Sequence, residues 1–331
     1  MAVACLLNTH RWLHDRLTEE AGYSATVIWT EDPRAADIVI YPVPPWRDHE
    51  APQRRVALRP DIARRVFVFS QDDRPILWAP GVFASVPAGH RDVASARGGF
   101  YVSHANYEPE HAEALQPRPY DDAAFLWCFV GSVSTCPAVR RPLVALQDER
   151  GHTFDTTAWL QQRWQLDGPG RDERARALIS YADALHQAKF IACPRGVGAS
   201  SIRLFEAMRV ARCPVVVSDD WLAPPFVDWD SCSVRIAEKD LRHLPAILRE
   251  READAEALGI QARAVWERRY APPTMLNTLA ESCLDIAESR LSGRSRCAMA
   301  GRAALSRETA SRIAPPVRHA LRRLRQFRAG R

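Results

Sequence analysis

Long apolar runs are missing from this chain of 331 residues. No stretch of about 18 uninterrupted apolar residues occurs, so we expect no membrane-spanning helix. The first residues, Met1–Arg11, lack a basic leader and an extended apolar segment, and we expect them to begin a β-strand rather than a secretion signal. These absences favour a cytoplasmic protein. With 47% hydrophobic residues, the chain is long enough to form two cores.

Cysteine pairs with the spacing of metal or redox sites are also missing. Eight cysteines are present, but none forms a Cys-x-x-Cys pair, and several lie within apolar runs. We therefore expect buried free thiols rather than disulfides or a zinc site. The two familiar phosphate-binding fingerprints, Gly-x-Gly-x-x-Gly and Gly-x-x-x-x-Gly-Lys-[Ser/Thr], are absent as well.

What the chain does contain is a different phosphate-site pattern over residues 189–208. An apolar run over 190–193 ends at Pro194, which is typical of a buried β-strand that stops at a loop. A glycine-bearing loop and the beginning of a helix follow directly. A strand, a glycine loop and a capped helix, in this order, hold nucleotide phosphates in doubly wound α/β domains. The segment therefore predicts such a domain.

The loop and the helix start have the residues that an anion site needs. Gly196 and Gly198 allow the backbone to approach a bulky ligand closely. Ser200 or Ser201 is expected to cap the helix, whose first N–H groups are free to bind an anion. We expect the phosphates to lie at this helix end.

Side chains supply the positive charge at this loop. Arg195 lies in the loop and Arg203 near the first helical turn, where a guanidinium beside a diphosphate contributes roughly 4 kcal/mol at about 4 Å and an effective dielectric of ~20. Glu206 shares the helix face of Arg203, and its carboxylate can accept hydrogen bonds from ribose hydroxyls. The three residues predict a nucleotide-sugar site. The alternative is an Arg203–Glu206 surface ion pair worth a few tenths of a kcal/mol.

Further motifs follow in a fixed order. They are Cys-Pro-Arg-Gly at 193–196, Ser-x-Arg-x-x-Glu-Ala at 201–207, a Cys-Pro-Val-Val-Val-Ser strand at 213–218, Trp221, Pro-Phe at 225–226 and Asp-Trp at 228–229. This order resembles the exostosin family of glycosyltransferases, glycosyltransferase family 47, over residues 129–248. The resemblance implies an inverting transferase of the two-domain GT-B type, in which the C-terminal domain binds a nucleotide sugar without a metal.

Two outer elements extend the resemblance. Phe129-Val130-Gly131, followed by Arg140 and Arg141, is similar to the element that opens the nucleotide-binding domain of the family. Family members often carry an arginine where this chain has Val130, which shifts the expected phosphate contact to Arg140 or Arg141. Downstream, residues 233–238 are similar to a Ser-Val-x-Ile-x-Glu strand of the family. The donor-binding candidates that the motifs imply are Gly131, Arg140, Arg141, Arg195, Gly196, Ser200, Ser201, Arg203 and Glu206.

The first 120 residues alternate between strand and helix patterns. Strand patterns cover 3–7, 25–29, 36–42 and 65–70, and an amphipathic helix pattern covers 12–20. This alternation predicts a parallel sheet with ligands at the carboxyl ends of its strands. We predict two Rossmann-like, doubly wound α/β domains: an acceptor domain over 1–120 and a nucleotide-sugar domain over 121–289. An arginine-rich tail over 290–331 completes the chain.

An inverting transfer needs a base that removes the proton from the acceptor hydroxyl. In a GT-B enzyme we expect this base to come from the N-terminal domain. Asp73 and Asp72 follow a predicted buried strand and are the first candidates, with His10 and Glu108 as rivals. The alternative for the aspartates is that they cap a turn into Arg74-Pro75. His10 could equally be a polar residue at a strand end.

The sequence Asp228-Trp229-Asp230 formally matches the Asp-x-Asp motif that holds Mn²⁺ or Mg²⁺ in the other transferase architecture. It lies in a loop beyond a strand and follows the predicted nucleotide-binding helix. We therefore interpret it as a structural turn. The prediction is activity without a bound metal or any other cofactor.

The tail over 290–331 differs from the rest of the chain in charge. It contains twelve arginines, no lysine and one acidic residue, Glu308, which gives +11; the total of +5 then leaves −6 for residues 1–289. Apolar residues of 317–327 recur at helical spacing with arginines between them, which is typical of a helix on an anionic membrane surface. A disordered, solvated tail is the alternative. We do not expect nucleic acid as a partner.

These observations together predict an inverting glycosyltransferase of bacterial type. It moves a sugar from a nucleotide sugar, UDP-linked, to a hydroxyl of a glycan or lipid-linked glycan in surface polysaccharide synthesis, at the inner face of the membrane. One alternative is a fucosyltransferase-like enzyme that uses a GDP-sugar, against which the Cys-Pro-Arg-Gly motif argues. The other is a non-catalytic nucleotide- or carbohydrate-binding protein.

Overall fold

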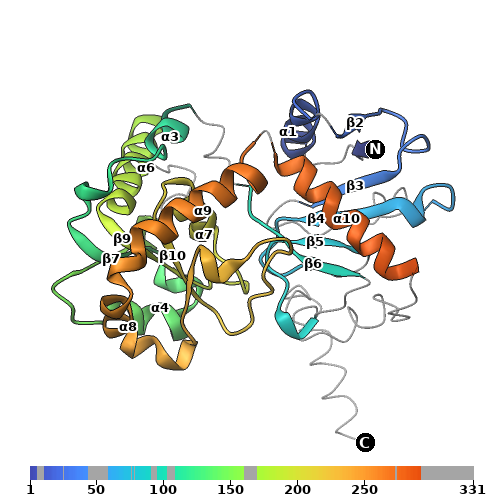
Figure 1. The fold of residues 1–331 in the computed structure, drawn as a ribbon. Helices are drawn as coiled ribbons and strands as arrows, with labels where there is room; N and C mark the ends of the chain where they lie inside the picture. Colours follow the sequence, from blue (N-terminus) through green and yellow to red (C-terminus); the bar gives the residue numbers. More distant parts are fainter. Residues whose placement is uncertain are drawn as a thin grey trace, which may run out of the picture.

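The computed structural model describes residues 1–5, 11–24, 26–43, 59–75, 77, 79–90, 95–102, 109–159, 170–272 and 274–291. Within these ranges the chain forms two α/β units that lie side by side, each built on its own β-sheet (Figure 1). His10 and Glu108, two of the predicted base candidates, lie outside the described residues, as does the tail beyond residue 291.

The first sheet has the strand order β2-β1-β3-β4-β5-β6, and every neighbouring pair is parallel. Its strands are β1 (Ala2–Cys5), β2 (Ile28–Trp29), β3 (Ile38–Val43), β4 (Val66–Ser70), β5 (Gly81–Phe83) and β6 (Ala96–Gly98). Every residue of β3 and β4 is buried, as expected for parallel strands that are covered on both faces. The parallel sheet predicted for the N-terminal part is confirmed.

Two helices that lie far apart in the sequence contribute to one core beside this sheet. Leu13 of α1 (Arg11–Ala21) and Ile286 of α10 (Met275–Leu291) belong to the same buried cluster. The Glu20 carboxylate joins the helices by accepting a hydrogen bond from the Leu276 N–H at 3.2 Å. The sequence placed 121–289 in the second unit as a whole, whereas α10 lies over the first sheet (Figure 1).

The second sheet has the order β11-β10-β9-β7-β8 and is also parallel throughout. Its strands are β7 (Phe125–Gly131), β8 (Gly151–Asp155), β9 (Ala188–Pro194), β10 (Cys213–Val217) and β11 (Val234–Arg235). As the sequence predicts, β9 ends at Pro194. The chain therefore has two parallel α/β sheets, as the GT-B prediction requires.

Helices cover both faces of the second sheet. The described helices of this unit are α3 (Pro109–Ala114), α4 (Pro137–Val144), α6 (Arg171–His186), α7 (Ile202–Arg209), α8 (Leu244–Glu250) and α9 (Ala255–Arg269). Successive residues of β7 point to opposite faces. Trp127 shares a core with α4 and α8, and Cys128 shares another with α6, α7 and α9. This is a doubly wound arrangement.

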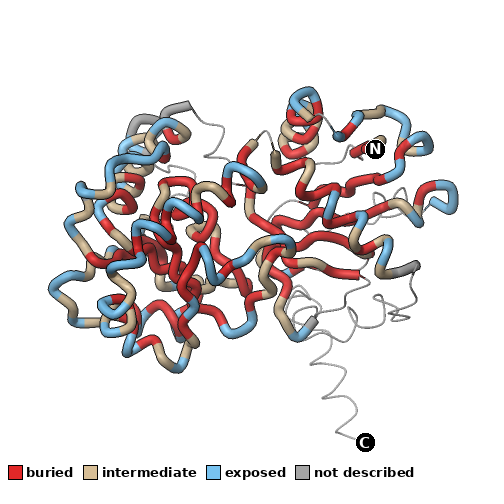
Figure 2. Tube along the Cα trace, viewed as in Figure 1, coloured by how far each residue is buried: buried red, intermediate tan, exposed pale blue. Residues whose placement is uncertain are grey.

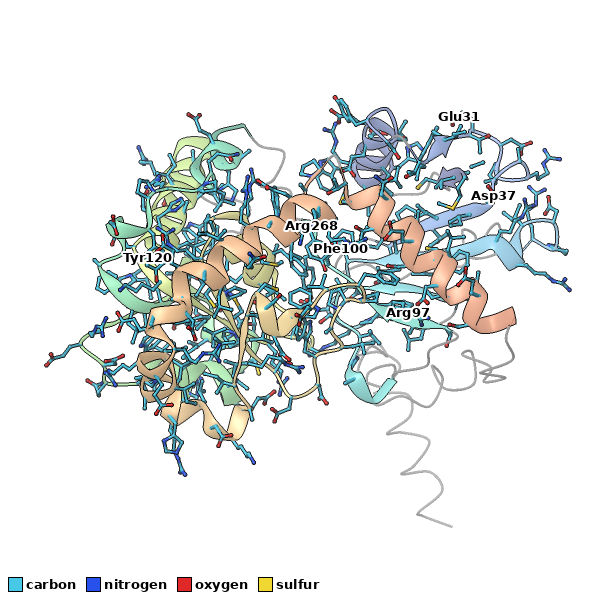
Figure 3. The ribbon with its side chains drawn as sticks, viewed as in Figure 1. Glu31, Asp37, Arg97, Phe100, Tyr120 and Arg268 are labelled. Atoms are coloured by element: carbon cyan, nitrogen blue, oxygen red, sulfur yellow. The ribbon has the colours of Figure 1, made fainter. Side chains whose placement is uncertain are left out.

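Aromatic side chains join the two units. The ring of Phe100, just after β6, lies 5.2 Å from that of Tyr270 and 6.4 Å from that of Phe205, between ring centroids. Figure 3 labels Phe100 where the units meet. All three rings belong to one buried cluster that continues from the first unit into the second, and Figure 2 shows the buried strands on both sides. The two sheets are therefore held together by a shared core.

The seven cysteines in the described part of the chain are free and buried, as the sequence predicts. Burial raises the pKa of the Cys128 thiol to about 12. Among the described residues, no helix combines the length and the apolar character that crossing a membrane requires. In the same residues, no three His, Cys, Asp or Glu side chains are grouped so as to hold a metal ion.

Candidate functional site

The strand order of the second sheet reverses between β7 and β9, and a crevice for a ligand is expected outside the carboxyl ends of these two strands. The chain leaves β7 for the edge strand β8 and then returns to form β9 on the other side of β7. In parallel α/β sheets, ligands bind where successive connections diverge in this way, outside the carboxyl ends of the strands. The loop after β7 (132–136) and the loop after β9 (195–201) follow these ends. The loop after β7 directly follows the predicted residue Gly131. The loop after β9 contains the predicted residues Arg195, Gly196, Ser200 and Ser201.

Arg140 connects these two loops by hydrogen bonds. This buried residue of α4 donates three hydrogen bonds to backbone carbonyls: to Ser132 O at 2.9 Å, to Pro194 O at 3.1 Å and to Arg195 O at 3.0 Å. A Cβ on Gly196 would lie 3.1 Å from its Nη2 atom, so glycine leaves room for the guanidinium. In the structure, Arg140 therefore shapes the crevice by holding its two sides.

Arg203 reaches the same place from the first turn of α7. Its Nε–H donates to the carbonyl oxygen of Val130 at 2.5 Å. An ideal Cβ on Gly131 would come within 2.0 Å of its Nη2 atom, so only glycine lets the side chain cross the end of β7. Sequence reasoning proposed an Arg203–Glu206 surface pair as an alternative, but no such ion pair occurs among the described residues. The side chain of Arg203 is directed to the end of β7 instead.

Two serine hydroxyls at the start of α7 have no protein partner among the described residues. Ser200 and Ser201 are 5% and 6% exposed, and neither side-chain oxygen makes a hydrogen bond. Ser201 occupies the N-cap position with extended backbone, as predicted, but its hydroxyl does not cap the helix. A buried hydroxyl without a partner costs free energy. The hydrogen-bonding capacity of these two oxygens is therefore unused within the described protein.

Glu206 lies one turn further along α7. Its carboxylate is buried and accepts a hydrogen bond from the Tyr181 hydroxyl at 2.5 Å. Burial raises the pKa of Glu206, while the Tyr181 hydrogen bond and the charges of Arg203 and Arg209 oppose the rise. Tyr181, on α6, was not among the sequence-predicted residues. It orients the carboxylate that the sequence assigned to a ribose.

Two other predicted arginines lie apart from these groups. The side chain of Arg195 forms an ion pair with Glu238 at 2.7 Å, and Glu238 also hydrogen-bonds the backbone of Asp219. Arg195 therefore joins the loops that follow β9, β10 and β11. Arg141 is exposed on α4, and its charge acts on Asp155 at the end of β8.

The first unit closes against the glycine loop at Gly198. A Cβ on this glycine would lie 2.0 Å from the Ser85 hydroxyl and 2.3 Å from the carbonyl oxygen of Asp73. The Ser85 hydroxyl also accepts a hydrogen bond from the Ser200 N–H at 3.0 Å. The loops after β4 and β5 thus touch the loop after β9. Asp73, predicted from the sequence as the base, lies beside the predicted donor-binding residues.

The two adjacent aspartates have different surroundings. Asp72 is buried and accepts a hydrogen bond from the Arg74 N–H at 2.8 Å, which is the turn-capping alternative. The carboxylate of Asp73 instead accepts a hydrogen bond from the Tyr101 hydroxyl at 2.5 Å. Burial raises the pKa of Asp73, and the bond from Tyr101 lowers it. Of the two, Asp73 has the environment of a general base.

Tyr101 and Ser85 are site residues that sequence reasoning did not find. Tyr101 follows the short strand β6 after the Gly98-Gly99 pair, and Ser85 follows β5. A polar residue at the carboxyl end of a predicted strand is the signal that could have indicated them. Both strands have only three residues, which is too short for a clear pattern.

The Asp-Trp-Asp sequence forms a turn. Trp229 is buried at the start of a short 3₁₀ helix (Trp229–Ser231), and its indole N–H donates to the carbonyl oxygen of Pro224 at 3.0 Å. Asp228 and Asp230 are exposed on either side of it. The tryptophan anchors this loop, so the geometry agrees with the interpretation as a structural turn.

The fold and the candidate site define a class of protein. Two parallel-sheet α/β units that meet at the loops after their strands form the GT-B architecture, with the candidate site in the second unit. Residues 99–251 match the Exostosin GT47 domain family model. This part of the chain is therefore similar to the exostosin GT47 domain of glycosyltransferases, and it contains β7–β11 and every predicted donor-binding residue.

Curated relatives are similar to this chain over part of their length. The chain is 33% identical over 99 residues to an exostosin-1 homolog of Caenorhabditis elegans, covering 29% of this chain and 25% of the relative. It is 28% identical over 142 residues to exostosin-1 of Mus musculus, covering 41% of this chain and 19% of the relative. The chain therefore spans a quarter or less of these proteins.

Solved structures of glycosyltransferases resemble the fold more distantly. A glycosyltransferase from Rickettsia africae aligns with a TM-score of 0.40 and 9% identity, over 88% of this chain and 98% of that one. WaaG, a glycosyltransferase involved in lipopolysaccharide biosynthesis, aligns with a TM-score of 0.37 and 10% identity, over 84% and 99%.

Proposed function

We propose that the chain is an inverting glycosyltransferase that binds a UDP-sugar in the crevice between β7 and β9 and transfers the sugar to a hydroxyl of a glycan or lipid-linked glycan. The diphosphate lies at the beginning of α7, and the ribose lies near Glu206. Surface polysaccharide synthesis is the role that this chemistry serves. The exostosin-like domain supports transfer of a sugar, and the residues of the crevice support the position of the donor.

The observation that carries the proposal is the pair of unpartnered hydroxyls at the start of α7. Ser200 and Ser201 are buried without a hydrogen bond in the described part of the protein, at a helix end whose dipole favours negative charge. Arg203 brings a guanidinium to the adjoining end of β7. Unused hydroxyls, a helix N-terminus and a guanidinium together are suited to a diphosphate.

The transfer uses groups from both units: Asp73 of the first, and Arg203 and the N–H groups of α7 of the second. The carboxylate of Asp73 accepts the proton of the acceptor hydroxyl as its oxygen bonds to the anomeric carbon. The bond from the anomeric carbon to the diphosphate breaks, and UDP leaves with the electron pair. Arg203 and the N–H groups of α7 stabilise the negative charge on the leaving diphosphate. Asp73 is then protonated and releases its proton to water.

A nucleotide panel tests the donor. The full chain is heated with UDP, GDP, dTDP or CMP, because a ligand that binds the folded state raises the melting temperature. We expect the largest rise with UDP. A rise confined to GDP supports the fucosyltransferase-like alternative, and no rise with any nucleotide contradicts a nucleotide-sugar enzyme.

Turnover separates an enzyme from a binding protein. Release of free UDP from a panel of UDP-sugars is measured with and without oligosaccharide acceptors. We expect slow hydrolysis without acceptor and faster release with the right acceptor. Tight UDP binding without any release over the whole panel contradicts the transferase and favours a non-catalytic binding protein.

Metal independence is part of the proposal, since Asp228 and Asp230 flank a structural turn. UDP release is compared before and after treatment with EDTA. We expect the same rate. A complete loss that Mn²⁺ restores contradicts this part and reopens the Asp-x-Asp alternative.

The place of action is the remaining part of the proposal. The arginine-rich sequence over 290–331 supports attachment to the inner face of an anionic membrane. Sedimentation of the full chain with vesicles of phosphatidylglycerol and phosphatidylcholine tests it. Replacement of Arg322, Arg323 and Arg325 by glutamine is expected to reduce binding at low salt; unchanged binding contradicts membrane attachment by this tail.

A further inference from the structure

A row of polar groups leads from the donor loop to the proposed base. The Ser200 N–H donates to the Ser85 hydroxyl oxygen at 3.0 Å. The Ser85 hydroxyl opposes the rise that burial causes in the pKa of the Tyr101 phenol, and the Tyr101 hydroxyl donates to the Asp73 carboxylate at 2.5 Å. The row of polar groups therefore ends at the carboxylate.

This row of polar groups crosses from the second unit to the first. Ser200 belongs to the loop after β9, whereas Ser85, Tyr101 and Asp73 follow β5, β6 and β4 of the first sheet. Ser85 is 1% exposed. The close approach at Gly198, where a Cβ would meet both the Ser85 hydroxyl and the Asp73 carbonyl oxygen, holds the loops in register. The row of polar groups is therefore part of the contact between the two units.

The direction of the hydrogen bonds determines their effect. A hydroxyl that donates to a carboxylate stabilises its charged form. Four other influences act on Asp73 from the elements packed against it. Burial and the neighbouring charge of Asp72 raise its pKa, and the charges of Arg140 and Arg74 lower it. The phenol of Tyr101 supplies the only hydrogen bond described for this side chain.

We propose that Tyr101 is a positioning residue that orients the Asp73 carboxylate and keeps it ionised, and that Ser85 makes this orientation depend on the donor loop. The inference rests on the proposed function, since it assigns partners to the base of that reaction. Tyr101 itself exchanges no proton with the substrate. It holds the carboxylate oxygen Oδ1, which leaves Oδ2 for the acceptor hydroxyl.

The test compares Tyr101→Phe with the wild type. UDP release from a UDP-sugar that the wild type hydrolyses is measured across pH, together with the Kd for UDP. Loss of the hydrogen bond raises the pKa of Asp73, so the acid limb of the kcat/KM profile is expected to move up by about one pH unit. At neutral pH, kcat is expected to fall about tenfold, with the Kd for UDP within about twofold.

Tyr270→Phe is the matched control. This tyrosine is also buried at the junction of the units, but its hydroxyl has no hydrogen-bond partner among the described residues. We expect its pH profile to coincide with that of the wild type. Ser85→Ala leaves the Tyr101–Asp73 bond in place and removes the link to Ser200. It is expected to shift the acid limb in the same direction as Tyr101→Phe, but by less.

The outcomes separate this inference from the proposed function. A wild type that releases no UDP from any UDP-sugar contradicts the proposed function itself. An active wild type whose Tyr101→Phe variant keeps the wild-type pH profile overturns the inference and leaves the function standing. So does an active Asp73→Asn variant, because the positioned carboxylate is then not the base.

Discussion

The guanidinium groups of Arg140 and Arg203 lie over the same aromatic ring, that of Phe129, at 5.6 Å and 5.1 Å from its centroid. Neither forms an ion pair with a carboxylate in the part of the protein that the structure describes. Burial and the charge of Arg203 lower the pKa of Arg140 to about 9. Two neighbouring cations without an ion-pair partner repel each other, and a bound diphosphate would offset this repulsion with its negative charge.

The first prediction separates the adjacent arginines of α4. Arg140→Met removes three hydrogen bonds to backbone carbonyls at the crevice. It is expected to lower the free energy of unfolding by about 2–3 kcal/mol. The exposed Arg141→Met is the matched control, expected to change it by less than about 0.5 kcal/mol. Urea denaturation measures both. Equal losses contradict the structural role of Arg140.

The second prediction concerns the space at Gly131. Gly131→Ala places a Cβ where the Nη2 atom of Arg203 lies, so Arg203 must move. We expect UDP to bind about tenfold more weakly, a loss of about 1.4 kcal/mol. Gly170→Ala is the control, because a Cβ there meets no atom of the described residues within 4 Å.

A double variant shows whether Gly131 acts through Arg203. Arg203→Ala alone is expected to weaken UDP binding at least as much as Gly131→Ala. Because both changes remove the same contact, their effects are not expected to add in the double variant. Titration calorimetry of all four proteins gives the comparison. Fully additive losses mean that Gly131 acts in another way.

The third prediction tests the ribose contact. Glu206→Ala is expected to cost about 1.5–3 kcal/mol in UDP binding, if the carboxylate accepts charge-assisted hydrogen bonds from the ribose. UDP and 2′-deoxy-UDP are titrated into the wild type and the variant. The wild type is expected to prefer UDP, and the variant to lose the preference. A variant that binds UDP as the wild type does excludes this role.

The fourth prediction uses the ionisation of the same residue. Burial raises the pKa of Glu206 above its ordinary value of 4.5 in the folded protein. The folded state therefore binds this proton more tightly than the unfolded state, and the resulting stability is present below about pH 4.5 and lost as the pH rises through the raised pKa. Glu206→Gln has no such proton. Its melting temperature relative to the wild type is expected to rise between about pH 4.5 and pH 8; a constant difference contradicts the shift.

The sequence predicted the strand and the helix of the candidate site well. The apolar run before Pro194, the glycines and the Ser-x-Arg-x-x-Glu motif are continuous in the chain, so periodicity and turn chemistry place β9 and the beginning of α7 correctly. The ion pair between Arg195 and Glu238 could not be predicted from the sequence, because Glu238 lies in the loop after a different strand, β11. The position of α10 over the first sheet could not be predicted either, because it depends on which apolar surface the other elements of the fold leave uncovered.

Side-chain geometry also decided between the alternatives that the sequence left open. Asp72 and Asp73 are neighbours with the same side chain, and only the structure shows one capping a turn and the other bound by Tyr101. Ser200 and Ser201 were equally suited as helix caps. The structure places Ser201 at the N-cap but leaves both hydroxyls unused, which no local pattern could indicate.

Those hydroxyls allow the most direct test of the donor site, a titration of UDP into the Ser200→Ala, Ser201→Ala double variant. Neither hydroxyl has a protein partner in the described structure, so the variant is expected to be at least as stable as the wild type. Ser218→Ala is the contrasting control, because that hydroxyl donates to the Ala199 carbonyl oxygen at 2.7 Å and its loss is expected to cost about 1 kcal/mol of stability. If the diphosphate lies at the beginning of α7, the double variant binds UDP about tenfold more weakly or worse. Wild-type affinity for UDP in a fully folded double variant would contradict the account.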